Sequence, residues 1–236
     1  MAKMTLDELV AQLRSAFGSG LQSVVLYGSA AGGEHIAKRS DYNVLVIVDE
    51  LSTERLQAAS AVAVAWSEQG NPPPLMLTDA EWRGSSDIFP MEYADILERH
   101  RLLHGTAPFD GIKIDPRDLR LQLEHETMGK LLKLRRGILA AGNRRDKQLE
   151  LLDASVSTIM VLFRALLRLH GDKPPTDNVA LSEAVAVRAG FEPGAFTRVV
   201  RHVRGEVKLP AADVAQVLHD YVRGVERVAR YVDQWQ

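Results

Sequence analysis

A glycine–serine pair and two polar residues that follow it form the stretch of the sequence best suited to chemistry. Gly28 and Ser29 come directly after the apolar run 24–27, and Asp41 and Asn43 open a second apolar run. Glycine lets backbone N–H groups approach a ligand closely, and a serine hydroxyl adds a donor for phosphate oxygens. In an extended chain Asp41 and Asn43 share one face, because side chains alternate along a strand. The spacing therefore predicts a strand–turn–strand unit that holds a metal-bound triphosphate.

The order Gly28-Ser29, eleven further residues, then Asp41-Tyr42-Asn43 resembles the signature of the polymerase-β-like nucleotidyltransferases, which include the aminoglycoside and minimal nucleotidyltransferases. Gly28, Ser29 and Asp41 match the signature, whereas Asn43 stands where the family has a second carboxylate. The resemblance covers residues 21–48. It implies that Asp41 and Asn43 hold Mg²⁺, that ATP or another nucleoside triphosphate is the substrate, and that a nucleoside monophosphate passes to a small-molecule or protein acceptor.

The same resemblance implies a third acid, the general base, on the predicted strand 75–78. The matching residue is Met76, which cannot accept a proton, and loss of a general base typically lowers a rate by about 10²–10⁴-fold. Glu92, on the next predicted strand, is the candidate replacement, with a solvated strand glutamate as the alternative. Lys130 is the candidate cation for the phosphates, with a solvated helix face as the alternative. With Asn43 and Met76 in place of acids, the resemblance implies a degenerate active site.

Two functions remain open at this point. The first is Mg²⁺-dependent nucleotidyl transfer by Asp41, Asn43 and Glu92, with Gly28, Ser29 and Lys130 binding the nucleotide. The second is a catalytically inactive nucleotide-binding or protein-interaction module of the same fold. The sequence does not decide whether the protein is an enzyme.

The composition limits the class of protein and its partners. Of 236 residues, 46% are hydrophobic and 25% are charged, which is typical of a soluble globular protein. A net charge of −2 gives no reason to expect nucleic acid or an anionic membrane as partner. The absence of cysteine excludes disulfides and thiolate metal sites and fits a reducing compartment. Without a long apolar run or a signal-peptide pattern, we expect a cytoplasmic protein, and a homodimer remains open.

The first half of the chain is predicted to form a mixed sheet with flanking helices. Thr5 and Glu8 have the spacing of a capping box, as do Thr78 and Glu81, so each pair predicts a helix start. Residues 91–96 alternate in polarity and predict a fourth strand that places Glu92 on one face and Asp95 on the other. The remaining predicted elements are helices over 6–17, 52–69 and a short one around Trp82, and strands over 24–27, 41–48 and 75–78.

The second half is predicted to be entirely helical. Asp115 followed by Pro116 is typical of a helix start, and apolar residues at helical spacing continue to about residue 141. Four more helices are expected, over 146–170, 179–189, 194–204 and 211–233. The fold class is therefore α+β: a nucleotidyltransferase-like domain over 1–108, then a helical bundle over 115–236, with the ligand between them.

Two other patterns of ionisable residues have alternative interpretations. His100 and His104 would share a helix face and could bind a metal, although a surface location is favoured without a third ligand. Arg164 and His170 loosely resemble the Arg-x(4–6)-His element of HEPN-type ribonucleases. A cationic helix end before Gly171 is the favoured interpretation.

Overall fold

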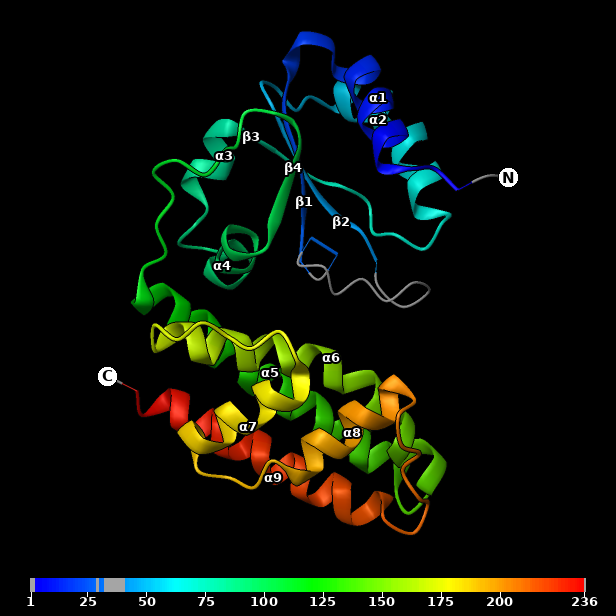
Figure 1. The fold of residues 1–236 in the computed structure, drawn as a ribbon, viewed down its shortest axis with the longest axis vertical. Helices are drawn as coiled ribbons and strands as arrows, with labels where there is room; N and C mark the ends of the chain where they lie inside the picture. Colours follow the sequence, from blue (N-terminus) through cyan, green and yellow to red (C-terminus); the bar gives the residue numbers. More distant parts are fainter. Residues whose placement is uncertain (1–2, 29, 32–40, 236) are drawn as a thin grey trace. The chain divides into compact units, whose positions relative to one another are not determined.

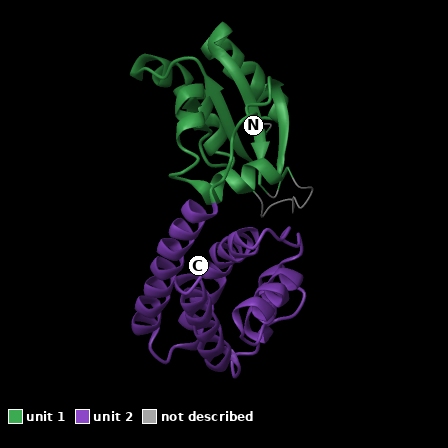
Figure 2. Ribbon diagram, turned by 90° about the vertical axis from the view of Figure 1, so that its left-hand side faces the viewer, with its two compact units in different colours: residues 1–115 green, residues 116–236 purple. Residues whose placement is uncertain are grey.

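The computed structural model describes residues 3–28, 30–31 and 41–235, and the chain divides into two compact units (Figure 2). The first unit, Met1–Asp115, is a four-stranded sheet with helices on both faces, and the second, Pro116–Gln236, is helical (Figure 1). A mixed α+β part followed by a helical part confirms the predicted fold class.

Strand β1 lies inside the sheet and carries the glycine of the Gly-Ser pair just beyond its end. The sheet order is β3-β2-β1-β4; β1 is antiparallel to β2 and β4, and β2 is parallel to β3. Tyr27, the last residue of β1, pairs with Asn43 on one side and His100 on the other. The elements of this unit are α1 (Leu6–Phe17), η1 (Gly18–Gly20), β1 (Leu21–Tyr27), β2 (Asn43–Val48), α2 (Thr53–Ser67), β3 (Leu75–Thr78), α3 (Asp79–Gly84), α4 (Pro90–Glu98) and β4 (His100–Gly105).

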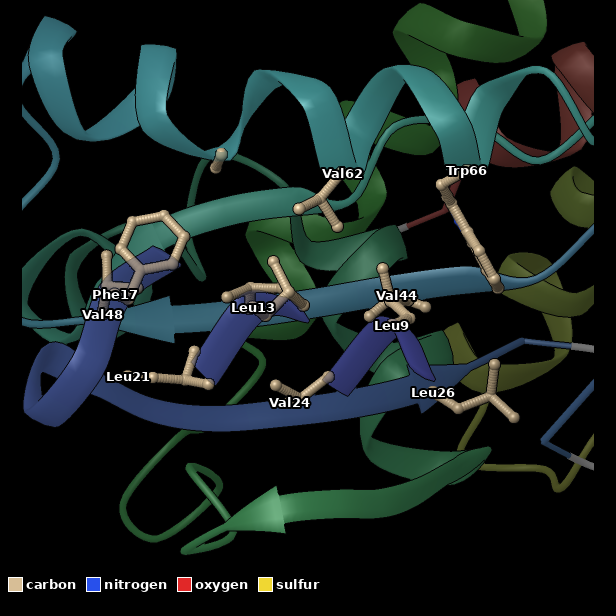
Figure 3. Packing of buried hydrophobic residues seen from close by; sticks show 12 residues of the cluster. Leu9, Leu13, Phe17, Leu21, Val24, Leu26, Val44, Val48, Val62 and Trp66 are labelled. Carbon is tan, nitrogen blue, oxygen red and sulfur yellow. The ribbon is translucent and has the colours of Figure 1, made fainter. Parts of the chain in front are cut away.

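Helices α1 and α2 cover one face of the sheet with apolar side chains (Figure 3). The Thr5 capping box is confirmed, since the Thr5 hydroxyl accepts from the Glu8 N–H while the Glu8 carboxylate accepts from the Thr5 N–H. Helix α1 then directs its apolar side to the sheet because its large side chains recur at positions three to four apart. The packed residues labelled in the figure are Leu9, Leu13, Phe17, Leu21, Val24, Leu26, Val44, Val48, Val62 and Trp66.

Helices α3 and α4 cover the opposite face, and two aromatic rings join them. The Thr78 capping box is confirmed at the start of α3. Trp82 is fully buried, its ring stacks on Tyr93 with 4.1 Å between centroids, and its indole N–H donates to the Pro108 carbonyl at 2.6 Å. The Tyr93 hydroxyl donates in turn to the Trp82 carbonyl at 2.6 Å. These contacts fix α4 against the sheet.

The prediction of a strand over residues 91–96 is wrong, because these residues belong to helix α4. Pro90 occupies the first turn of this helix, where its missing N–H costs no hydrogen bond. Met91 and Tyr93 are buried, as alternation predicts, but the next buried residue is Ile96, three positions on, which is helical spacing. The fourth strand is β4, so His100 and His104 lie on a strand and not at helical spacing.

The second unit spans Pro116–Gln236, and its first helix, α5, begins at Pro116, as the Asp115-Pro116 pair predicts. Its long helices pack through α5 against α6 and α9, around buried side chains such as Leu123, Phe163 and Tyr221. Among the described residues, no helix has both the length and the apolar composition that crossing a bilayer requires. The helices are α5 (Pro116–Ala141), α6 (Arg145–Leu169), α7 (Asn178–Ala189), α8 (Gly194–Arg204) and α9 (Val214–Asp233).

Candidate functional site

Polar side chains from two separate elements meet at the glycine that follows β1. Gly28 has a positive φ of 77°, a conformation that side-chain-bearing residues rarely adopt. A Cβ atom placed on Gly28 would lie 3.5 Å from Asn43 Nδ2 and 3.9 Å from Asp95 Oδ2. The Asn43 amide, from the start of β2, and the Asp95 carboxylate, from α4, therefore flank the Gly28 backbone.

Helix α4 gives this end of the sheet its negative charge. Glu92 and Asp95 are three residues apart, so both lie toward one side of α4. Burial raises the pKa of the nearby Tyr27 phenol, and the negative charges of Asp95 and Glu92 raise it further. Arg99 partly balances this charge, since its guanidinium lies 2.5 Å from Asp95 Oδ1 and its side chain is only 14% exposed.

The glycine–serine turn is less open to a ligand than its sequence predicts. The Gly28 N–H donates to the Arg99 carbonyl at 3.0 Å. It is therefore not available to a phosphate oxygen. The Gly28 carbonyl accepts from the Ala31 N–H at 3.1 Å, which closes a tight turn. Ser29, the predicted phosphate ligand, lies outside the described residues.

Asp41 precedes β2, which begins at Asn43, so strand alternation does not by itself bring the two side chains together. Asp41 is exposed and, with Tyr42, Asn71 and Arg101, lines a cavity of about 1020 Å³. The Asn71 side-chain oxygen accepts from the Tyr42 N–H at 3.1 Å and anchors this stretch. The joint role of Asp41 and Asn43 as metal ligands stays a prediction.

The strand expected to carry the third acid presents only apolar side chains to the face that bears Asn43. Met76 pairs with Val46 and packs with the α1–α2 cluster, on the opposite face of the sheet. Leu77 packs on the face that α3 and α4 cover. Leu75 lies two residues earlier on the same strand, so it faces the same side of the sheet. Helix α4 brings two acids to this face, where Glu92 is exposed and Asp95 is half-buried.

Asp95 was not among the site residues predicted from the sequence. A strand over 91–96 would place Asp95 and Glu92 on opposite faces, whereas helix α4 brings them toward one side. Phe89-Pro90 was the signal for the correct assignment, since proline is common in the first turn of a helix and poor within a sheet.

Lys130 lies in the second unit, on α5. Its ammonium is 3.2 Å from the Glu126 carboxylate, one turn earlier, so the described structure pairs it within its own helix. Its contact with phosphate stays a prediction.

The possible metal ligands around Gly28 fit an ion that binds together with the triphosphate better than an ion that is bound permanently. Among residues 3–28, 30–31 and 41–235, no group of three or more His, Asp or Glu side chains could hold a metal. Mg²⁺ is commonly held by one or two carboxylates, with phosphate and water oxygens completing its octahedron. Asp95, Asp41 and the Asn43 amide oxygen are ligands of the right chemistry for that role.

The histidine and arginine patterns have structural roles in the described residues. The His100 ring packs against Phe109 in a tilted arrangement with 4.1 Å between centroids, and its Nδ1 lies 2.9 Å from the Ile96 carbonyl. Arg164 is buried, not at an exposed cationic helix end, and donates to Asn178 Oδ1 at 2.7 Å. His170 Nε2 lies 3.0 Å from the Tyr231 hydroxyl.

We expect His170 to make the stability of the chain depend on pH. Burial lowers the His170 pKa, the positive charge of Arg188 lowers it further, and Asp172 partly opposes both. Folding therefore favours the neutral ring, and this stability is present above the unfolded pKa of about 6.5 and is lost as pH falls below it. Melting temperatures measured between about pH 8 and about pH 5 should fall more for the wild type than for His170→Gln. Equal falls would contradict this prediction.

Comparison with known proteins agrees with the fold. Neither a family model nor a curated protein matches the sequence. Among solved structures, the chain is similar to a spectinomycin adenyltransferase, AAD(9), from Enterococcus faecialis, determined with ATP and spectinomycin. The TM-score is 0.58 at 12% sequence identity, over 93% of this chain and 98% of that one. The chain therefore has a nucleotidyltransferase fold.

Proposed function

We propose that the protein is a nucleotidyltransferase that moves a nucleoside monophosphate from a Mg²⁺-bound nucleoside triphosphate, such as ATP, to a hydroxyl of a small molecule or protein. The meeting of Asn43 and Asp95 at Gly28 carries this proposal. In a nucleotidyltransferase fold, a carboxylate and a side-chain amide beside Gly28 support a role in holding a metal-bound triphosphate. Spectinomycin, present with ATP in the similar structure, is the first small-molecule acceptor to test.

The chain's own groups have distinct tasks in this mechanism. Mg²⁺, when bound with the triphosphate, would supply positive charge to the phosphates. Asp95 and Asn43 would help to hold that ion, and Asp41 is the third candidate ligand. Glu92, exposed on the same helix as Asp95, accepts the proton of the acceptor hydroxyl. The lone pair of that oxygen then attacks phosphorus as pyrophosphate leaves.

A second function, nucleotide binding without transfer, rests on a separate observation. Arg99 already neutralises Asp95, and its carbonyl occupies the Gly28 N–H. An arginine paired in this way can replace the charge of a metal ion without its Lewis acidity. Titration calorimetry with ATP, with and without Mg²⁺, tests binding in both cases. Failure to bind at roughly millimolar ATP would contradict both functions.

We expect Asn43→Asp to strengthen binding of a divalent cation at Gly28. Asparagine and aspartate have nearly the same shape, so the change adds charge without repacking. Two carboxylates would then flank Gly28, which is unfavourable without a cation and favourable with one. The gain in metal affinity should be about 1–3 kcal/mol, the difference between charged and neutral partners.

Thermal unfolding with increasing Mg²⁺ measures this effect. The rise in melting temperature should be larger for Asn43→Asp than for the wild type. Asn143→Asp, an exposed change in the turn between α5 and α6, is the matched control and should behave as the wild type does. Equal rises in all three proteins would show that no metal reaches this end of the sheet.

A further inference from the structure

Four large apolar side chains form a stripe along α5, on the side opposite to its buried face. The stripe consists of Leu121, Met128, Leu132 and Leu139, which are 58%, 47%, 45% and 84% exposed. At 3.6 residues per turn they lie within about 20° of one line along the helix. Of the six buried residues of α5, Leu131 lies about 80° around the helix from the stripe. The other five lie about 120° or more away: Leu119, Leu123, Thr127, Leu134 and Ala141. The stripe is therefore not part of the core that α5 forms with α6 and α9.

The spacing of the stripe is symmetric about residue 130. Leu121 and Leu139 lie nine residues to either side of it, and Met128 and Leu132 lie two residues to either side. The seven-residue steps from 121 to 128 and from 132 to 139 are those of helices that pair along a seam. A stripe that reads the same in both directions is complementary to an antiparallel copy of itself. A two-fold axis requires this property of an interface between identical subunits.

We propose that α5 pairs with α5 of a second copy of this chain, antiparallel and centred near residue 130. In this arrangement Leu121 packs against Leu139 of the second copy, and Met128 packs against Leu132 of the second copy. Soluble monomers rarely expose a large continuous apolar patch. Pairing would bury these four side chains of each chain and remove that patch from water.

Charges beside the stripe support the antiparallel direction. Glu124 and Arg135 lie on the same flank of α5. Glu124 is about six residues before residue 130, and Arg135 is about five residues after it. In an antiparallel pair each Glu124 comes level with Arg135 of the second copy, at both ends of the seam. In this chain Glu124 pairs with Arg120 and Arg135 pairs with Glu226, so the new contact extends two existing ion pairs.

Sedimentation of the full-length chain over a range of concentrations tests the pairing. We expect a reversible dimer, and Leu139→Glu should weaken it by about 100-fold or more because a two-fold interface contains each substitution twice. Val187→Glu is the matched control, since Val187 is 85% exposed on α7 and lies outside the stripe. It should leave the dimer unchanged. If the chain were a monomer at every concentration, the proposal would be wrong. The stripe would then contact another part of the chain or another protein.

Cross-linking tests the direction and register, because the chain has no cysteine of its own. Leu121→Cys and Leu139→Cys chains, mixed and oxidised, should cross-link to each other. Neither should cross-link to itself, since equivalent residues would lie about 27 Å apart and a disulfide requires Cα atoms within about 7 Å. Self-cross-linking of Leu121→Cys would indicate a parallel pair and would overturn the antiparallel arrangement.

Discussion

Replacing Asp95 by asparagine should reduce the release of pyrophosphate from Mg²⁺-bound ATP in the presence of an acceptor by at least about 100-fold. Among the residues that the structure describes, Asp95 has the carboxylate nearest to Gly28, and the change removes its charge while keeping its shape. A neutral side chain would orient the Mg²⁺-bound triphosphate poorly and would remove the ion pair with Arg99. The rate and the affinity for ATP should both be measured, because a ligand of the metal affects both.

Asp79→Asn is the matched control for this experiment. Asp79 also pairs with an arginine one helical turn later, Arg83, at 2.8 Å, but this pair is exposed on α3. An exposed pair contributes little to stability, so Asp79→Asn should keep both rate and affinity. If Asp95→Asn retained the wild-type rate, the proposed role of Asp95 would be wrong. If both variants lost activity, the cause would be a general disturbance of the first unit and not the loss of a single ligand of the metal.

Trp82→Ala should lower the free energy of unfolding of the first unit by about 3–5 kcal/mol. The side chain is fully buried, and its removal leaves a cavity beside Tyr93 and an unpaired carbonyl at Pro108. Because this stack fixes α4 against the sheet, the same change should weaken ATP binding at Gly28. Urea unfolding followed separately for each unit measures the first effect, and calorimetry measures the second.

Trp82→Phe separates the two contributions of the indole. It keeps a ring against Tyr93 but loses the N–H that donates to Pro108, so the loss should be about 1–3 kcal/mol. The transition of the helical unit should not move in either variant. A change below about 1 kcal/mol for Trp82→Ala would mean that α4 is held by other contacts.

The sequence alone determined those features that depend on neighbouring residues. The capping boxes at Thr5 and Thr78 start the helices predicted for them, because each hydroxyl and carboxylate satisfies backbone donors only three residues away. Pro116 starts α5 for an equally local reason. The strand after Asn43 and the turn at Gly28 also follow from short-range preferences for apolar strands and positive φ.

Only the tertiary structure decided that residues 91–96 form a helix and that Asp95 lies beside Gly28. Positions 91 and 93 alternate as in a strand, whereas 93 and 96 have helical spacing, and the stack of Trp82 on Tyr93 buries both rings when the segment is helical. Asp95 reaches Gly28 because α4 packs across the end of β1, a contact between distant parts of the chain. Local patterns do not encode such contacts, since they depend on how complete elements pack. The sequence therefore located the turn, and the packing of α4 determined which acid lies beside it.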